Sequence, residues 1–193
     1  MRTTSGAPRD RSVSPPRRRT PRAARASDLH GFHDWFASRG WEAFPFQEEV
    51  WQACAAGTSG LLHAPTGTGK TLAAWFGAIA RTQAVDADTT APPAGLRVVW
   101  ITPLRALAAD TVRALEEPLR GPHAVARGWT VGTRTGDTSA ADRRRLRENW
   151  PTTLVTTPES LSILLSLDDA HEIFAGLEAV VVDEWHELLS TKR

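Results

Sequence analysis

Short apolar runs alternate with helical patterns along most of the chain. The apolar runs predict five β-strands, at residues 60–64, 96–102, 129–135, 153–157 and 177–184. Apolar residues at helical spacing predict helices, one from Ser27 or Asp28 to Gly40 and others at about 46–56, 70–82, 104–119, 139–149, 158–166 and, more briefly, 169–175. Because strands and helices alternate, we expect an α/β fold with a parallel sheet and helices on both faces.

Two segments lack such a pattern. Residues 83–95 are polar and proline-rich, so we expect a surface loop. Residues 1–27 hold eight arginines and one acidic residue among many prolines, serines and threonines, which predicts a disordered tail. This tail could be an arm attracted to nucleic-acid phosphates, a solvated leader, a mis-assigned start or a transit peptide. The folded part is therefore predicted to span residues 28–193.

Composition narrows the class of protein further. A hydrophobic fraction of 41% suits one globular domain. Cys54 is the single cysteine, which excludes an internal disulfide and fits a reducing compartment such as the cytosol. No apolar run reaches about 18 residues, so no transmembrane helix is expected, and the N-terminus lacks the apolar region of a secretory signal. We therefore expect a cytoplasmic protein that does not act at a membrane.

A glycine-rich segment, Ala-Pro-Thr-Gly-Thr-Gly-Lys-Thr, joins the expected strand 60–64 to the expected helix 70–82. This order is the context of a Walker A phosphate loop, although Ala64 replaces the first glycine, and the alternative is a chance glycine-rich turn. The glycines let successive N–H groups converge on phosphate oxygens, and the helix N-terminus adds positive charge. The predicted nucleotide-binding residues are Pro65, Thr66, Gly67, Thr68, Gly69, Lys70 and Thr71.

Two residues of this loop have particular roles. Lys70 is one of only two lysines in a chain that otherwise uses arginine. Its compact ammonium group fits between the β- and γ-phosphates, whereas a planar guanidinium would not. The hydroxyl of Thr71 would ligate Mg²⁺.

An acidic pair follows the last predicted strand. Asp183 and Glu184 come directly after four apolar residues, at the carboxyl end of the strand, where open α/β sheets bind ligands. Asp183 would hold Mg²⁺, and Glu184 would orient and deprotonate the attacking water. The alternative is that Asp183 only caps the helix that follows. Paired with the phosphate loop, the acidic residues favour nucleotide hydrolysis, with Lys70, Asp183 and Glu184 as the catalytic residues.

These motifs carry a family resemblance. Asp183-Glu184-Trp185-His186 resembles the DExH box of superfamily-2 helicases, and residues 64–71 resemble motif I. Residues 102–107, 134–137 and 156–160 resemble the nucleic-acid-facing motifs, and Phe46-Gln47 resembles a Q motif. More narrowly, "ITPLRALAAD", "TGDTS" and "DEWHELLSTKR" are similar to the Lhr-type helicases, and to the bacterial ligase-associated DEXH-box DNA helicases proposed to act in DNA repair. The resemblance covers residues 28 to 193.

The resemblance implies a RecA-like fold, ATP and Mg²⁺ as cofactors, and roles for the matching residues. Gln47 would read the adenine edge, with Phe46 or Trp41 packing nearby, although Gln47 also suits an ordinary helix N-terminus. His186 would couple the ATP site to other elements. Contacts to a nucleic-acid backbone would come from Thr102, Pro103, Leu104, Arg105, Gly136, Asp137, Thr157, Pro158 and Glu159. Arg105 could instead be structural, Thr157 and Pro158 also suit helix initiation, and the arginine-rich run 142–148 is most simply a solvated helix face.

The same resemblance implies further parts beyond residue 193. Members carry a motif III strand between the motif I and motif II strands, and a second RecA-like domain with an arginine finger. We therefore expect an N-terminal fragment of a DNA helicase that cannot unwind alone, has low stability, and has either a gap in its sheet or direct pairing of the two strands. Implied partners are single-stranded or tailed duplex DNA, and DNA ligase and nuclease repair proteins. An RNA helicase domain and a non-catalytic nucleotide-binding fragment remain alternatives.

Overall fold

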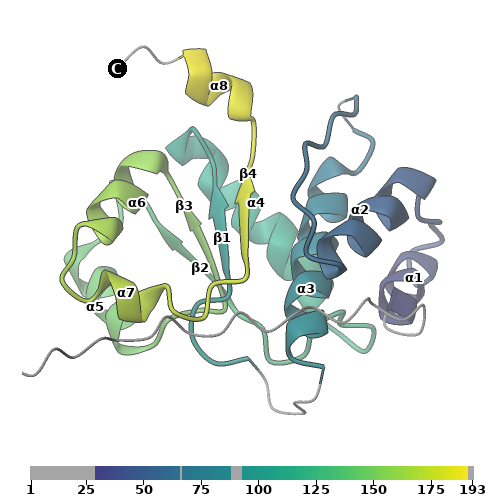
Figure 1. Ribbon diagram of the computed structural model, residues 1–193, viewed down its shortest axis with the longest axis horizontal. Coiled ribbons are helices and arrows are strands. Elements are labelled where there is room, and N and C mark those ends of the chain that lie inside the picture. Colours follow the sequence, from purple (N-terminus) through teal and green to yellow (C-terminus); the bar gives the residue numbers. More distant parts are fainter. Residues whose placement is uncertain (1–28, 66, 88–92, 191–193) are drawn as a thin grey trace, which may run out of the picture.

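The computed structural model describes residues 29–65, 67–87 and 93–190. Within these residues, a parallel sheet of four strands has the order β2-β3-β1-β4, as Figure 1 shows. The strands are β1 (Val98–Ile101), β2 (Val131–Arg134), β3 (Thr153–Thr156) and β4 (Ala179–Val182). Each lies inside one of the predicted apolar runs, so four of the five predicted strands and their parallel arrangement are confirmed.

Helices connect the strands where the helical patterns predict them. They are α1 (His30–Ala37), α2 (Pro45–Ala55), α3 (Lys70–Val85), α4 (Arg105–Glu116), the 3-10 helix η2 (Glu117–Leu119), α5 (Ala140–Glu148), α6 (Pro158–Leu165), α7 (Ala170–Ile173) and α8 (Trp185–Ser190). At the start of α6, the Thr157 hydroxyl accepts from the Ser160 N–H and Pro158 is the first helical residue. This N-terminus therefore has the capping hydroxyl and pre-set backbone that the sequence predicts.

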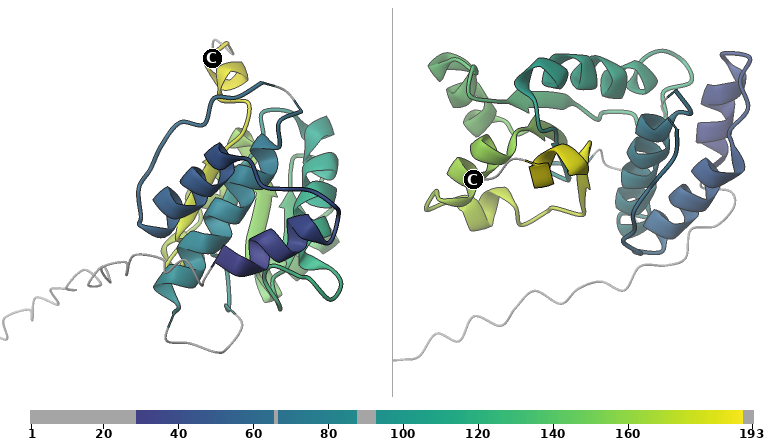
Figure 2. Two further views of the ribbon diagram at one scale, coloured as in Figure 1. Left: turned by 90° about the vertical axis from the view of Figure 1, so that its right-hand side faces the viewer. Right: turned by 90° about the horizontal axis from the view of Figure 1, so that it is seen from above.

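Helices cover both faces of the sheet, as predicted (Figure 2). On one face, Trp75 of α3 and Leu115 of α4 join Val98 and Trp100 of β1 in the main hydrophobic core. On the other face, Leu164 of α6 joins a smaller cluster of buried side chains. Helices α1 and α2 lie outside α3 and do not cover the sheet directly.

An aromatic cluster fixes α1 and α2 against α3. Phe76 of α3 lies 4.7 Å from Phe32, 5.4 Å from Trp35 and 5.6 Å from Trp51, measured between ring centroids. Trp35, Trp51 and Phe76 are at most 1% exposed. Edge-to-face and tilted aromatic pairs of this kind add to the free energy gained from burial alone. The cluster therefore holds the N-terminus of α2 beside the N-terminus of α3.

The predicted strand at residues 60–64 is wrong, because this segment lies outside the sheet. Leu61, within this apolar run, is 71% exposed. The edge strand β4 exposes Val180 and Val182 by 54% and 43%. The segment does not pair with β4, so the expected direct pairing does not occur, and β4 is an edge of the four-stranded sheet. An apolar run becomes a strand only when a neighbouring strand satisfies its backbone groups.

The unpatterned segments also differ in part from expectation. Helix α3 runs three residues into the predicted loop and ends at Val85. Residues 88–92 of that loop and the predicted tail at 1–27 lie outside the described residues. Arg97, just before β1, donates two hydrogen bonds to the carboxylate of Asp86, the C-cap of α3, at 2.9 and 2.8 Å. This bidentate pair ties the end of α3 to the start of β1.

Candidate nucleotide site and strand-end loops

The glycine-rich loop enters α3 through two residues in the left-handed region. Gly67 has φ of +82° and Gly69 has φ of +81°, and Gly69 is the N-cap of α3. Residues with side chains rarely adopt such angles. The hydroxyl of Thr68 donates to the Pro65 carbonyl at 2.7 Å, which closes the turn. Thr66 lies outside the described residues.

The Lys70 ammonium group points back into the loop. Its Nζ donates to the Ala64 carbonyl at 2.7 Å, and the residue is half-buried. Lys70 is also the first residue of α3, so its charge adds to the positive end of the helix. A phosphate bound in the loop would offer this ammonium group a charged acceptor in place of the neutral carbonyl, which is a stronger hydrogen bond.

Gln47 links α2 to the glycine-rich loop. The side chain is 1% exposed, its Nε2 donates to the Gly69 carbonyl at 3.1 Å, and its Oε1 accepts from the Phe44 N–H at 2.8 Å. The second bond satisfies a backbone donor at the start of α2, as a helix N-terminal residue does. Each polar atom of the carboxamide therefore has one bond within the chain, which leaves its second N–H and the second lone pair of its oxygen for an adenine edge.

Aromatic side chains lie next to Gln47. Phe46 is half-buried and stacks against Phe44, with ring centroids 6.0 Å apart and planes 14° from parallel. Trp41 and Phe44 are each 54% exposed. Phe44 was missed by sequence reasoning, although its spacing of two residues from Phe46 across Pro45 could have indicated an aromatic pair.

The contact between Gly69 and Gln47 leads to a test of the loop geometry. A Cβ at Gly69 would lie 2.7 Å from Gln47 Nε2, whereas a Cβ at Gly67 would meet no atom within 4 Å. Both alanine variants force a side chain into the left-handed region, which costs about 1–2 kcal/mol. Gly69→Ala also displaces buried Gln47, so we expect its total loss of unfolding free energy to be about 2–4 kcal/mol. Urea denaturation of the two variants measures the difference, and equal losses would contradict the packing of Gln47 on Gly69.

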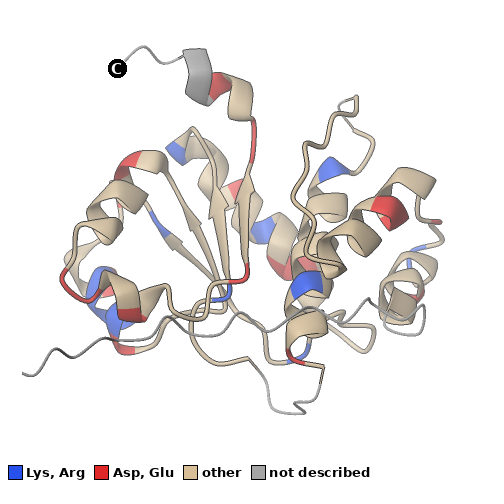
Figure 3. Ribbon diagram, in the orientation of Figure 1, with Lys and Arg blue, Asp and Glu red and all other residues tan. Residues whose placement is uncertain are grey.

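The acidic pair, Asp183 and Glu184, follows β4 at the end of the molecule where α3 begins. The Asp183 N–H donates to the Ile101 carbonyl at 2.9 Å, and Asp183 is half-buried. Burial raises the pKa of the Asp183 carboxyl, and the Trp100 side chain, the Glu184 N–H and the Lys70 charge oppose that rise. Helix α3, which begins at Lys70, packs against β4, so the two motifs lie on neighbouring elements despite their distance in the sequence. The acidic segment after β4 is red in Figure 3.

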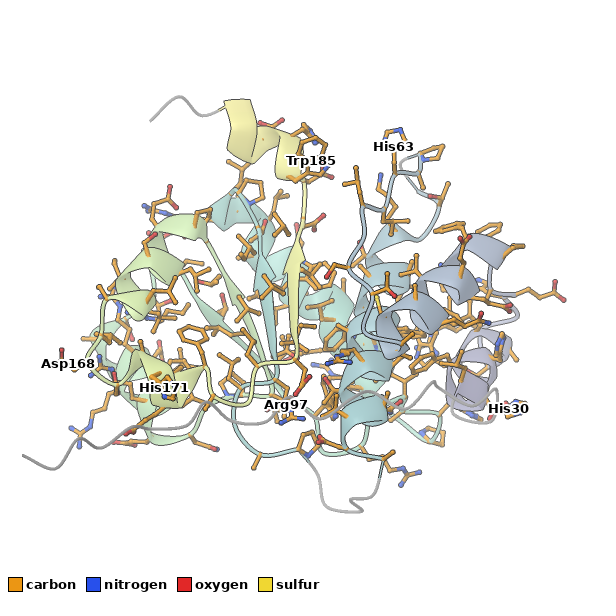
Figure 4. The ribbon with its side chains drawn as sticks, viewed as in Figure 1. His30, His63, Arg97, Asp168, His171 and Trp185 are labelled. Atoms are coloured by element: carbon orange, nitrogen blue, oxygen red, sulfur yellow. The ribbon has the colours of Figure 1, made fainter. Side chains whose placement is uncertain are left out.

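Glu184 has an unusual backbone. Its φ is +45°, and it is the one non-glycine residue with positive φ in the part of the chain that the structure describes. Such a conformation is strained, and strain of this kind is concentrated at functional sites. The Glu184 carboxylate is partly exposed and lies 3.5 Å from His186 Nδ1, while His186 Nε2 lies 3.5 Å from Glu187. Figure 4 places Trp185, between these residues, at the same end of the molecule as His63, just before the glycine-rich loop.

The predicted nucleic-acid residues divide into buried and exposed groups. Thr102 and Thr157 are each 1% exposed, so their side chains face the interior. Pro103 and Pro158 are half-buried. The exposed members are Leu104, Arg105, Gly136, Asp137 and Glu159. Contacts with a large ligand at this end of the sheet can therefore use these five residues, and backbone groups at the buried positions.

Arginines converge on the loop that follows β2. Arg105 forms an ion pair with Asp137 at 3.0 Å, and a Cβ on Gly136 would lie 2.8 Å from its guanidinium carbon. Arg143 of α5 donates to the Gly136 carbonyl at 3.2 Å. Buried Arg134 donates to the Ser160 carbonyl at 3.1 Å, and burial, together with Arg143 and Arg147, lowers its pKa. Sequence reasoning missed these roles of Arg134 and Arg143, because each contact joins residues from different elements.

The residues present fit a magnesium nucleotide. Mg²⁺ typically takes one or two protein oxygen ligands and completes its shell with phosphates and water. Thr71 and Asp183 provide a hydroxyl and a carboxylate, each half-buried. Among the described residues, no group of three or more histidine, cysteine or acidic side chains could hold a metal. No helix in the same part of the chain is long and apolar enough to cross a membrane.

Comparisons with known sequences agree with this arrangement. The DEAD/DEAH box helicase family matches residues 44–193. The chain is 40% identical over 168 residues to a protein of Mycolicibacterium smegmatis described as Lhr helicase and probable uracil glycosylase, and 38% identical over 170 residues to the Lhr helicase/uracil glycosylase of Escherichia coli K12. Each alignment covers 83% of this chain and 11% of the relative. The chain thus spans about a tenth of the length of these relatives.

Solved structures share the fold. The helicase Lhr of Mycobacterium smegmatis, bound to single-stranded DNA and AMP-PNP, matches with a TM-score of 0.68 and 37% identity, over 86% of this chain and 21% of that chain. The DUF1998 helicase MrfA, bound to DNA and AMPPNP, matches with a TM-score of 0.67 and 25% identity, over 86% of this chain and 22% of that chain. The predicted RecA-like helicase fold is therefore confirmed.

Proposed function

Because the chain belongs to the DEAD/DEAH box helicase family, we propose that it is the ATP-binding portion of an ATP-dependent DNA helicase of the Lhr type. The observation that carries this proposal is the meeting of two distant motifs. Helix α3, which begins at Lys70, packs against β4, and the start of α3 lies at the same end of the molecule as the end of β4, which Asp183 follows. A phosphate-binding lysine and a metal-binding carboxylate in one place are the requirements of nucleotide hydrolysis.

The residues of the site have separate roles in this proposal. The N–H groups of residues 65–71 and the Lys70 ammonium group hold the phosphates, and Thr71 and Asp183 hold Mg²⁺. The bound ion neutralises charge that develops on the transferred phosphoryl group. Glu184 accepts a proton from the attacking water, and its exposed carboxylate is accessible for that purpose. Phe46 and Gln47 border the base, and His186, which contacts Glu184, couples the site to other elements.

In this proposal, the exposed loops at the ends of the strands form the surface that binds nucleic acid. Their backbone N–H groups, hydroxyls and Arg105 would contact phosphates, which suits binding without base specificity. The Lhr structure that resembles this chain contains single-stranded DNA, so we propose single-stranded or tailed duplex DNA as the ligand. RNA is the second candidate, because phosphate contacts alone do not distinguish the two.

The proposed domain organisation is the one that helicases of this family have. Residues 28–193 form part of a first RecA-like domain, and unwinding requires a second domain that closes on the nucleotide and supplies an arginine. A role in DNA repair in the cytoplasm, with ligase and nuclease partners, belongs to the same proposal. The non-catalytic alternative is a domain that holds nucleotide without turning it over.

Hydrolysis of ATP by the chain, with and without nucleic acid, tests this function. We expect ATP binding and slow hydrolysis, with faster hydrolysis when single-stranded DNA is added than when single-stranded RNA is added. Binding without any hydrolysis would favour the non-catalytic alternative, and stimulation by RNA alone would favour an RNA helicase. The absence of ATP binding would reject the function altogether.

The ion pair between Arg105 and Asp137 provides a test of the nucleic-acid surface. Asp137→Asn removes an acidic group from the surface and releases Arg105, whose side chain is 59% exposed. We expect this variant to bind a single-stranded oligonucleotide about two- to fivefold more tightly at low salt, because one more cation is available to phosphates. Fluorescence anisotropy measures the affinity. Arg105→Ala is the control, because it removes the cation and is expected to weaken binding. Unchanged affinity in both variants would place the binding surface elsewhere.

A further inference from the structure

Trp100 carries a buried hydrogen-bond donor without a partner. Its side chain lies in β1 at 1% exposure, and its indole Nε1 forms no hydrogen bond in the structure. A buried N–H that stays unpaired carries a desolvation penalty, so such groups have a structural or functional reason. The indole N–H of the neighbouring Trp75, by contrast, donates to the Leu115 carbonyl at 3.0 Å.

The sheet places Trp100 beside the acidic motif. Trp100 pairs with Val181 of β4, and both side chains pack in the core beneath α3. Asp183 is two residues further along the chain than Val181, so the alternation of side chains puts it on the same face. The Asp183 N–H still bonds to the carbonyl of Ile101, the residue after Trp100. Asp183 is therefore the diagonal cross-strand neighbour of Trp100, a separation that a long aromatic side chain can bridge.

The electrostatics of Asp183 agree with this placement. After the dominant effect of burial, which raises the pKa of the carboxyl, the indole N–H of Trp100 is the strongest influence that lowers it. Trp35 and Trp51 also have buried indole N–H groups without partners, but their rings pack in the aromatic cluster around Phe76. Of these three tryptophans, Trp100 is the one that the sheet places beside a carboxylate of the site.

We propose that Trp100 is a positioning residue for the nucleotide site: in solution its indole N–H, which has no partner in this structure, donates a hydrogen bond to the neighbouring Asp183 carboxylate and fixes the orientation in which that carboxylate holds Mg²⁺. This inference rests on the proposed function, which makes Asp183 a metal ligand. Trp75 contacts the Trp100 ring edge-on, with centroids 6.5 Å apart, and so limits its rotation. Partners of this kind behind a metal ligand orient it and affect metal affinity.

The hydrogen bond can be observed without nucleotide. In protein labelled with ¹⁵N at the indole nitrogens, the Trp100 signal is the one that Trp100→Phe removes. We expect Asp183→Ala to shift this indole proton upfield, because a hydrogen bond to a carboxylate is lost, and to leave the Trp75 signal in place. Glu184→Ala, which removes the adjacent carboxylate, serves as the matched control. A Trp100 signal that moves equally in both variants, or in neither, would overturn the proposal.

The effect on the metal is measured by nucleotide affinity. Trp100→Phe keeps the ring and removes the donor, so we expect about tenfold weaker binding of ATP with Mg²⁺ and unchanged binding of ATP with EDTA. Trp129→Phe, which removes an indole N–H from the same core and leaves Trp75, Trp100 and Asp183 in place, is expected to change neither value. Wild-type affinity of Trp100→Phe for Mg²⁺-ATP would overturn the positioning role. If the unaltered chain bound no ATP, the proposed function would fail, and the indole signals alone would decide the hydrogen bond.

Discussion

Replacement of Lys70 by alanine is expected to abolish the binding of ATP at micromolar concentrations. The Lys70 ammonium group lies at the N-terminus of α3 and inside the glycine-rich loop, where it bonds to the Ala64 carbonyl. In the proposed complex it exchanges this neutral acceptor for phosphate oxygens. A charge-assisted hydrogen bond contributes about 1.5–3 kcal/mol, so the loss of contacts to two phosphates predicts at least about 100-fold weaker binding.

The matched variant for this prediction is Lys70→Arg. It keeps the positive charge but presents a planar group with a fixed array of donors, which does not fit between adjacent phosphates as an ammonium group does. We therefore expect Lys70→Arg to bind ATP nearly as poorly as Lys70→Ala. Titration with a fluorescent ATP analogue measures both variants, and circular dichroism confirms that they fold. Binding restored by arginine would show that the site uses only net charge.

Replacement of Glu184 by glutamine is expected to stop hydrolysis and leave ATP binding intact. The carboxylate is partly exposed at the carboxyl end of β4, on a backbone with φ of +45°, and contacts His186. Glutamine keeps the shape of the side chain but cannot accept a proton from water. A general base contributes about 10²- to 10⁴-fold to a rate, so the hydrolysis rate should fall by that factor.

Glu187→Gln is the control for Glu184→Gln. Glu187 also lies 3.5 Å from His186, through the other ring nitrogen, so this variant changes the same histidine environment without removing the proposed base. Single-turnover measurements with single-stranded DNA detect slow hydrolysis in all three proteins. We expect the wild-type rate in Glu187→Gln, and turnover retained in Glu184→Gln would exclude Glu184 as the base.

Local sequence patterns were sufficient to predict two kinds of element: strands that are buried on both faces of the sheet, and helix starts that are stabilised within one turn. The run around β3 predicted a strand correctly, because its four residues are all buried in the sheet. Thr157 and Pro158 predicted the start of α6, because the capping hydroxyl and the proline act within one turn. The loop and acidic motifs were also found from sequence, because each motif is continuous.

Interactions between distant elements were not predictable in the same way. Residues 60–64 have the apolar character of a strand, but the sheet offers them no neighbouring strand, and Leu61 is exposed. The two bonds of Gln47 and the placement of Trp100 beside Asp183 depend on how α2, α3, β1 and β4 pack together. No spacing in the sequence encodes those contacts. The burial of Thr102 was also not predicted: its motif indicates a ligand contact, and its buried side chain leaves only the backbone for that contact.

The central claim is that the glycine-rich loop and the residues after β4 form one site for ATP with Mg²⁺. Isothermal titration of the chain with a slowly hydrolysed ATP analogue, in Mg²⁺ and in EDTA, tests it most directly. We predict binding of one nucleotide per chain, weakened by EDTA and by Asp183→Ala, and lost in Lys70→Ala. Binding that is absent, or that is unchanged by Lys70→Ala and Asp183→Ala, would contradict the claim.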